Sequence, residues 1–180
     1  MKPSLTACLM LMWMIAFSAC STAPNSPGDR ERLVERADDT RRVFLMRDPS
    51  LEQLFDEAYA YAIFPSIGSG GIGIGGAYGR GVVYERGRHV GYCDVTQGDI
   101  GFQLGGQSYS QLIFFRTEEA LQRFKHGDLH MAARASAVAA TAGASADADY
   151  ERGVMVFTLA RGGLMYEAAI GGQRFTYTPR

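Results

Sequence analysis

Between residues 71 and 81 the chain alternates glycine with larger residues, and this alternation restricts what the segment can form. Small residues fill the odd positions and larger side chains fill most even ones, namely Gly71, Gly73, Gly75, Ala77, Gly79 and Gly81 against Ile72, Ile74, Tyr78, Arg80 and Val82. Because successive side chains of a strand point to opposite faces, the pattern predicts a strand with one nearly bare face. Glycine weakens a strand, so something must approach that backbone closely: a packed helix, a tight barrel corner or a ligand.

The same glycines match the GxGxxG spacing of a dinucleotide-binding loop. Such a loop follows a strand and opens a helix, whereas here Pro65 precedes the glycines and further strands follow them. The Lys-Ser/Thr pair of a P-loop is also missing from the sequence. We therefore infer that the glycines serve the packing of a strand backbone and do not bind a nucleotide.

Downstream of residue 61 the hydrophobic pattern has the period of strands. The runs bounded by glycine or charged turns are residues 72–78, 82–85, 89–95, 100–104, 111–115, 154–159, 164–170 and 175–177. They predict an antiparallel sheet, strongly curved. Residues 129–141 alternate as a strand does, although their alanine content also suits a helix, and we favour the strand.

Helical patterns lie mainly ahead of the strands. Residues 29–47 form an amphipathic pattern, and Asp48-Pro49 stops it and starts a second helix with Asp48 as N-cap. A third helix starts after Thr117 and ends at Gly127. The expected fold is α+β: a curved antiparallel or barrel-like sheet packed with a few helices, two of them N-terminal, in one domain from residue 29 to 180.

The first residues have the features of a secretory signal peptide. Lys2 precedes an apolar run that ends in Ser18-Ala19-Cys20, which is similar to a bacterial lipobox. We expect residues 1–19 to be removed, Cys20 to carry the acyl chains, and residues 20–28 to be a flexible tether. Ordinary cleavage after Ser18 or Ala23, or an uncleaved anchor, are the alternatives.

This prediction places the protein in the cell envelope. Ser21, and not aspartate, follows the cysteine. By resemblance to the sorting rules of enteric lipoproteins, this implies the outer membrane, facing the periplasm. Of the three cysteines, only Cys93 then remains as a thiol, and a small buried side chain is its expected role.

The sequence carries no motif that predicts catalysis. It contains no G-x-S-x-G, C-x-x-C or H-E-x-x-H. His126 and His130 have ligand spacing, but Gly127 lies between them, so loop histidines are the better interpretation. We expect no enzyme, no cofactor and no metal. With 18 Lys plus Arg against 19 Asp plus Glu, the net charge of -1 predicts no attraction to nucleic acid.

Arginine is strongly preferred over lysine, and it gathers in the first helical segment. Guanidinium groups grip phosphate in a planar, bidentate way. The arginines that could meet lipid headgroups, while Leu33, Ala37 and Phe44 insert or pack, are Arg30, Arg32, Arg36, Arg41 and Arg42. Acidic residues interleave with them, so an internally paired, solvated face is the alternative.

Four stretches in order resemble the SYLF domain family: AYAIFP at residues 60–65, GIGGAYGRG at 73–81, GFQLGGQ at 101–107 and GGLM at 162–165. The resemblance covers roughly residues 50 to 178. It implies an exported lipoprotein whose domain binds lipid, with Gly73, Gly75, Tyr78 and Arg80 joining the helix arginines as candidate lipid-binding residues.

The function that these observations predict is a noncatalytic envelope lipoprotein that binds anionic phospholipid at the membrane. A structural or protein-binding envelope module without a lipid ligand is the alternative, with an envelope protein or a second copy of the chain as partner. In that case the glycine-rich strand only packs.

Overall fold

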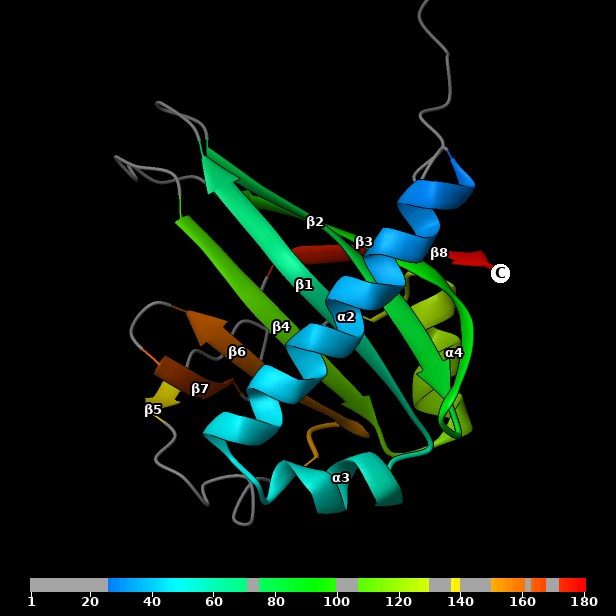
Figure 1. Cartoon of the computed structure of the whole chain (residues 1–180), viewed down its shortest axis with the longest axis vertical. Helices are drawn as coiled ribbons and strands as arrows, with labels where there is room; N and C mark the ends of the chain where they lie inside the picture. Colours follow the sequence, from blue (N-terminus) through cyan, green and yellow to red (C-terminus); the bar gives the residue numbers. More distant parts are fainter. Residues whose placement is uncertain are drawn as a thin grey trace, which may run out of the picture.

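The computed structural model describes residues 26–70, 75–99, 107–129, 137–139, 150–160, 163–167 and 172–180. Within these residues an antiparallel sheet of eight strands runs in the order β5-β7-β6-β4-β1-β2-β3-β8. Helices cover both of its faces, as Figure 1 shows. The predicted α+β class with a curved antiparallel sheet is confirmed.

Two helices precede the sheet, as predicted. Helix α2 spans Pro27–Arg47, and the Ser26 hydroxyl caps it by accepting a hydrogen bond of 3.1 Å from the Asp29 amide. Helix α3 spans Leu51–Glu57, so it starts two residues later than the predicted Pro49. The Asp48 carboxylate accepts hydrogen bonds from the amide and hydroxyl of Ser50, and these bonds close a turn ahead of the helix. Asp48 therefore ends α2 instead of capping α3.

The strands are β1 (Ala60–Gly70), β2 (Gly75–Glu85), β3 (Arg88–Asp99), β4 (Gln107–Phe115), β5 (Ala137–Ala139), β6 (Val154–Ala160), β7 (Gly163–Glu167) and β8 (Gln173–Pro179). Strands β3, β4, β6 and β8 are longer than the hydrophobic runs that predicted them. The described part of the run 72–78 and the whole run 82–85 belong to one strand, β2. No run predicted β1, because Pro65 interrupts its pattern, and there the register shifts between Ile63 and Ser66. The predicted strand at 100–104 lies outside the described residues.

The sheet separates two apolar cores. One lies under α2 and α3, where Leu33, Phe44 and Phe55 pack against Ile63 and Phe114 of the sheet. The other lies under α4 (Glu118–Lys125), where Leu121 and Phe124 pack with Phe175 and other buried residues of the strands. Helix α2 crosses one face diagonally and α4 lies on the other (Figure 1). As predicted, Thr117 caps α4 and Gly127, at φ +74°, follows its end.

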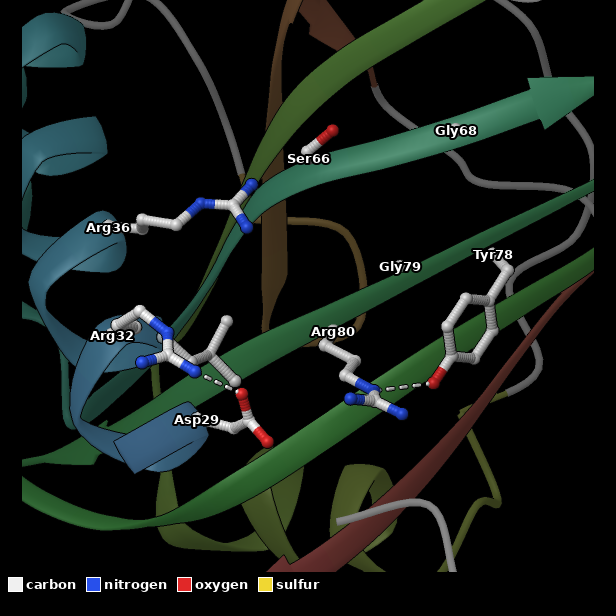
Figure 2. Close-up of a pocket in the computed structure, with 9 residues that line it drawn as sticks. Asp29, Arg32, Arg36, Ser66, Gly68, Tyr78, Gly79 and Arg80 are labelled. Atoms are coloured by element: carbon white, nitrogen blue, oxygen red, sulfur yellow. Dashed lines mark hydrogen bonds and ion pairs between the residues drawn. The ribbon is translucent and has the colours of Figure 1, made fainter. Parts of the chain in front are cut away.

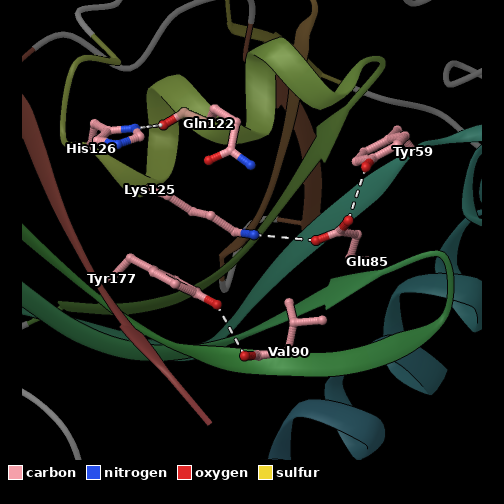
Figure 3. A network of polar contacts seen from close by, with 7 residues as sticks. All are labelled: Tyr59, Glu85, Val90, Gln122, Lys125, His126 and Tyr177. Carbon is pink, nitrogen blue, oxygen red and sulfur yellow. Dashed lines mark hydrogen bonds and ion pairs between the residues drawn. The ribbon is translucent and has the colours of Figure 1, made fainter.

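A partly buried polar network ties α4 to the sheet (Figure 3). Lys125 Nζ lies 3.2 Å from Glu85 Oε2, while Tyr59 donates a 2.9 Å hydrogen bond to Glu85 Oε1. Lys125 also lies 5.2 Å from the centre of the Tyr177 ring, and Tyr177 donates to the carbonyl of Val90. Although burial opposes it, the bonds from Tyr59 and Lys125 lower the pKa of Glu85 and keep it charged.

The glycine-bearing face of β2 packs within the sheet. A Cβ built at Gly79 would lie 2.6 Å from Ile67 Cγ1, and one at Gly81 would lie 2.7 Å from the Ile63 carbonyl oxygen. Ile67 belongs to the core under α4, so the space beside these two glycines on that face is filled by β1 and by core side chains. Val82 and Tyr84, on the other face of β2, belong to the core under α2.

Candidate functional site

A pocket of about 450 Å³ lies between the N-terminal half of α2 and strands β1 and β2 (Figure 2). We call it the arginine pocket, and its lining residues are Asp29, Arg32, Leu33, Arg36, Ser66, Gly68, Tyr78, Gly79 and Arg80. Four of the predicted lipid-binding residues therefore come together: Arg32 and Arg36 from the helix, and Tyr78 and Arg80 from the sheet.

Local structure explains why these side chains meet. Arg32 and Arg36 are four residues apart, so they share one flank of α2. Tyr78 and Arg80 occupy even positions of β2 and share its α2-facing side. On β1 the bulge at Pro65 shifts the register, and Ser66 then pairs with Arg80 while Gly68 pairs with Tyr78.

One of the three arginines is paired with the carboxylate at the rim. Arg32 Nη2 lies 2.6 Å from Asp29 Oδ1, and the Ser26 hydroxyl donates a 2.7 Å hydrogen bond to Asp29 Oδ2. These bonds from Ser26 and Arg32 lower the pKa of the Asp29 carboxyl. Asp29 therefore carries its charge at neutral pH.

Arg80 is held by a chain of polar contacts. Its Nε donates a 2.9 Å hydrogen bond to the Tyr78 hydroxyl, which donates a 2.8 Å bond to Asp94 Oδ1. Asp94 is only 4% exposed, and its Oδ1 lies 3.8 Å from Arg80 Nε. Burial is the main cause of the raised pKa of Tyr78, so its hydroxyl stays protonated. Arg80 is thus fixed in orientation at the edge of the pocket.

Arg36 is the arginine whose charge is not balanced locally. Within the described part of the chain its guanidinium makes no hydrogen bond or ion pair, and Figure 2 shows this group directed toward β1 near Ser66. A guanidinium that is free to donate, beside two oriented ones, can bind an oxyanion such as a phosphate or carboxylate.

The other predicted arginines lie elsewhere, so they do not form one cluster. Arg30 lies 5.5 Å from the Tyr92 ring centre, and Arg42 is ion-paired with Asp39. Both line a second pocket of about 890 Å³ on the opposite flank of α2, with Glu31, Glu35 and Asp38 among its residues. Arg41 lies 4.5 Å from the Phe55 ring centre, and its Nε is buried.

The remaining predicted residues are Gly73, Gly75 and Cys20. Gly75 begins β2 opposite Asp99. Gly73 and Cys20 fall outside the described residues. The apolar side chains Leu33, Ala37 and Phe44 are all buried against the sheet, so this face of α2 packs and is not available for insertion into a bilayer.

Sequence reasoning missed three residues that shape the pocket. Asp29 had a usable signal, because it stands three residues before Arg32 on the same helix. Ser66 and Asp94 had none: their positions depend on the bulge in β1 and on the pairing of β2 with β3, which no local pattern reveals.

Two further properties concern the described residues only. None of the helices seen there is long and apolar enough to cross a membrane. In the same part of the chain no three His, Cys, Asp or Glu side chains are grouped as metal ligands.

Comparison with known proteins yields a family and a relative. Residues 96–178 match the family model Ysc84, described as Las17-binding protein actin regulator. The chain is also 28% identical over 140 residues to beta cell expansion factor A of Aeromonas veronii, an alignment that covers 76% of this chain. It covers 53% of that relative, so the chain spans about half the relative's length. With the ordered glycine motifs, these matches are consistent with the SYLF domain family, which the Ysc84 model represents.

Proposed function

We propose that this chain is a noncatalytic envelope lipoprotein whose domain binds anionic phospholipid through the arginine pocket. The observation that carries the proposal is the convergence of Arg32, Arg36 and Arg80 from two elements far apart in sequence. Three guanidinium groups face one lining carboxylate, Asp29, so the lining is positively charged although the whole chain has a net charge of -1.

The chemistry of the pocket suits a phosphate at a membrane surface. Arg36 can donate two parallel hydrogen bonds to phosphate oxygens, and the Ser66 hydroxyl lies on the strand that it faces. Tyr78 is 45% exposed although it is large and aromatic. Tyrosine of this kind suits the boundary between headgroups and acyl chains, where one end of the ring is apolar and the other is wet.

Chain length supports the placement of this pocket at the bilayer. If Cys20 carries the lipid, five residues (21–25) separate the anchor from Ser26, the cap of α2. The six extended Cα–Cα steps from Cys20 to Ser26 reach at most about 20 Å. The N-terminal end of α2, beside which the pocket lies, is therefore held close to the headgroups, and we propose the periplasmic face of the outer membrane as that surface.

Vesicle flotation of the lipid-free protein tests the proposal. Residues 21–180 should be used, because a start at Asp29 would remove the cap Ser26 and the first residues of α2. With phosphatidylglycerol vesicles at low salt, Arg36→Gln should weaken binding by about tenfold, the loss expected for a charged hydrogen-bond partner. Arg47→Gln is the matched control, because Arg47 is an exposed arginine of α2 outside both pockets.

The control also separates binding in the pocket from general attraction. If Arg36→Gln and Arg47→Gln weaken binding equally, the surface charge of α2 suffices and the pocket is not the site. If the wild-type protein does not float with these vesicles, lipid binding is refuted. A protein-binding role then becomes the better function, in line with the description of the family model as a Las17-binding protein.

A further inference from the structure

We propose that Asp29 is a fixed counter-ion that sets the charge of the headgroup the arginine pocket accepts, so that a phosphodiester with one negative charge is preferred over a phosphomonoester with two. This inference rests on the proposed function. It adds the class of phospholipid, and it assigns a role to a carboxylate that does not itself bind the lipid.

The argument starts from the charges around the pocket. Arg32 is balanced by Asp29 at 2.6 Å. Arg80 is balanced by the buried Asp94, which it meets directly at 3.8 Å and through the Tyr78 hydroxyl. Only Arg36 remains without a balancing carboxylate among the described residues. With Asp29 and Asp94 both counted, the three arginines therefore leave one net positive charge, which one phosphodiester charge neutralises.

A second negative charge would meet the Asp29 carboxylate. That carboxylate lines the pocket itself, and it is held in place by Ser26 on one oxygen and by Arg32 on the other. Its lowered pKa keeps it charged at the pH where a phosphomonoester is a dianion. The Asp29 carboxylate and the second charge of the phosphomonoester are both negative, so they repel each other. This repulsion offsets part of the binding free energy that the dianion gains from the arginines.

Asp94 is less suited to this selecting role. It is 4% exposed, accepts a hydrogen bond from Tyr78, and does not line the pocket. Its charge is used to orient Tyr78 and Arg80. The side chain of Asp29 is 46% exposed at the pocket rim, so its replacement can change the charge that the ligand meets while the core stays intact.

The test compares two lipids at equal surface charge. Phosphatidylcholine vesicles carry either phosphatidylglycerol or phosphatidic acid, in amounts that give the same zeta potential at about pH 8, where a phosphomonoester with a second pKa near 6 is doubly charged. The proteins are wild type, Asp29→Asn and Asp39→Asn, all as residues 21–180. Asp39→Asn is matched, because Asp39 also pairs with an arginine three residues later on α2 but lines neither pocket.

We expect the wild-type protein and Asp39→Asn to bind phosphatidylglycerol vesicles more tightly than phosphatidic acid vesicles. In Asp29→Asn the ratio of the two affinities should move several-fold toward phosphatidic acid, with an unchanged circular dichroism spectrum. An unchanged ratio in Asp29→Asn, or the same shift in Asp39→Asn, overturns the inference. The effect of Arg36→Gln on phosphatidylglycerol binding shows separately whether the pocket is the site, so the two failures are distinguishable.

Discussion

Replacing Gly81 by alanine should destabilise the protein, because its Cβ would enter an occupied space. The added carbon would lie 2.7 Å from the Ile63 carbonyl oxygen, 2.8 Å from Phe64 Cδ1 and 2.9 Å from Cys93 Sγ. Ordinary contacts between carbon atoms are about 3.5–4.0 Å. One of the three neighbours is backbone of β1, so the overlap cannot be relieved by a side-chain rotation alone.

The magnitude follows from two opposing effects. Overpacking of this kind costs about 1–3 kcal/mol, and three simultaneous overlaps place Gly81→Ala in the upper half of that range. Alanine also lowers the conformational entropy of the unfolded chain, which stabilises the folded protein by about 0.4–1 kcal/mol. The expected net loss is about 2 kcal/mol in the free energy of unfolding, or about 4–8 °C in Tm for a domain of this size.

Urea unfolding followed by far-ultraviolet circular dichroism measures this loss. Tryptophan fluorescence cannot be used, since Trp13 is the only tryptophan and lies ahead of residue 21. Gly68→Ala is the control, because a Cβ at Gly68 would meet nothing within 4 Å. It should leave stability unchanged or slightly raised. If Gly81→Ala is as stable as Gly68→Ala, close packing does not explain the glycines of β2.

Two further predictions concern partly and fully buried groups. Burial and the nearby Arg180 lower the pKa of His89 from 6.5, so the unfolded state binds this proton more readily and the free energy of unfolding should fall as pH drops below about 6.5. In urea unfolding, His89→Gln should show a smaller fall between about pH 7 and pH 5 than the wild-type protein. An equal fall in the two proteins would contradict this prediction. Cys93 is the only cysteine after residue 20, and burial raises the pKa of its thiol. Ellman's reagent should therefore label it only in denaturant. Rapid labelling of the native protein would refute this prediction.

The elements with a strong local signal were predictable from the sequence. Apolar spacing fixed α2, and Thr117 with Gly127 marked both ends of α4. β1 was not predicted, because Pro65 and the neighbouring bulge break the alternation on which strand prediction depends. The start of α3 was misplaced because Asp48 closes a turn through Ser50 instead of capping the helix directly.

The candidate site was predictable only in part, for a similar reason. Residue type identified Arg32, Arg36, Tyr78 and Arg80, since guanidinium and aromatic groups are suited to phosphate and membrane surfaces. Their grouping depends on tertiary packing. Arg32 and Arg36 lie near Arg80 because their flank of α2 faces β2, whereas Arg42 lies on the opposite flank.

The strand order has a consequence for how this domain can be divided. The family match begins at residue 96, after β1 and β2 and within β3. Yet β1 and β2 lie at the centre of the sheet, between β4 and β3, and the last strand, β8, pairs with β3. An excised 96–178 fragment would hold β4 and β8 with the strands that join them missing. The segment recognised by the family model is therefore not a folding unit, and deletion studies of this protein should keep the chain intact from Ser26 onward.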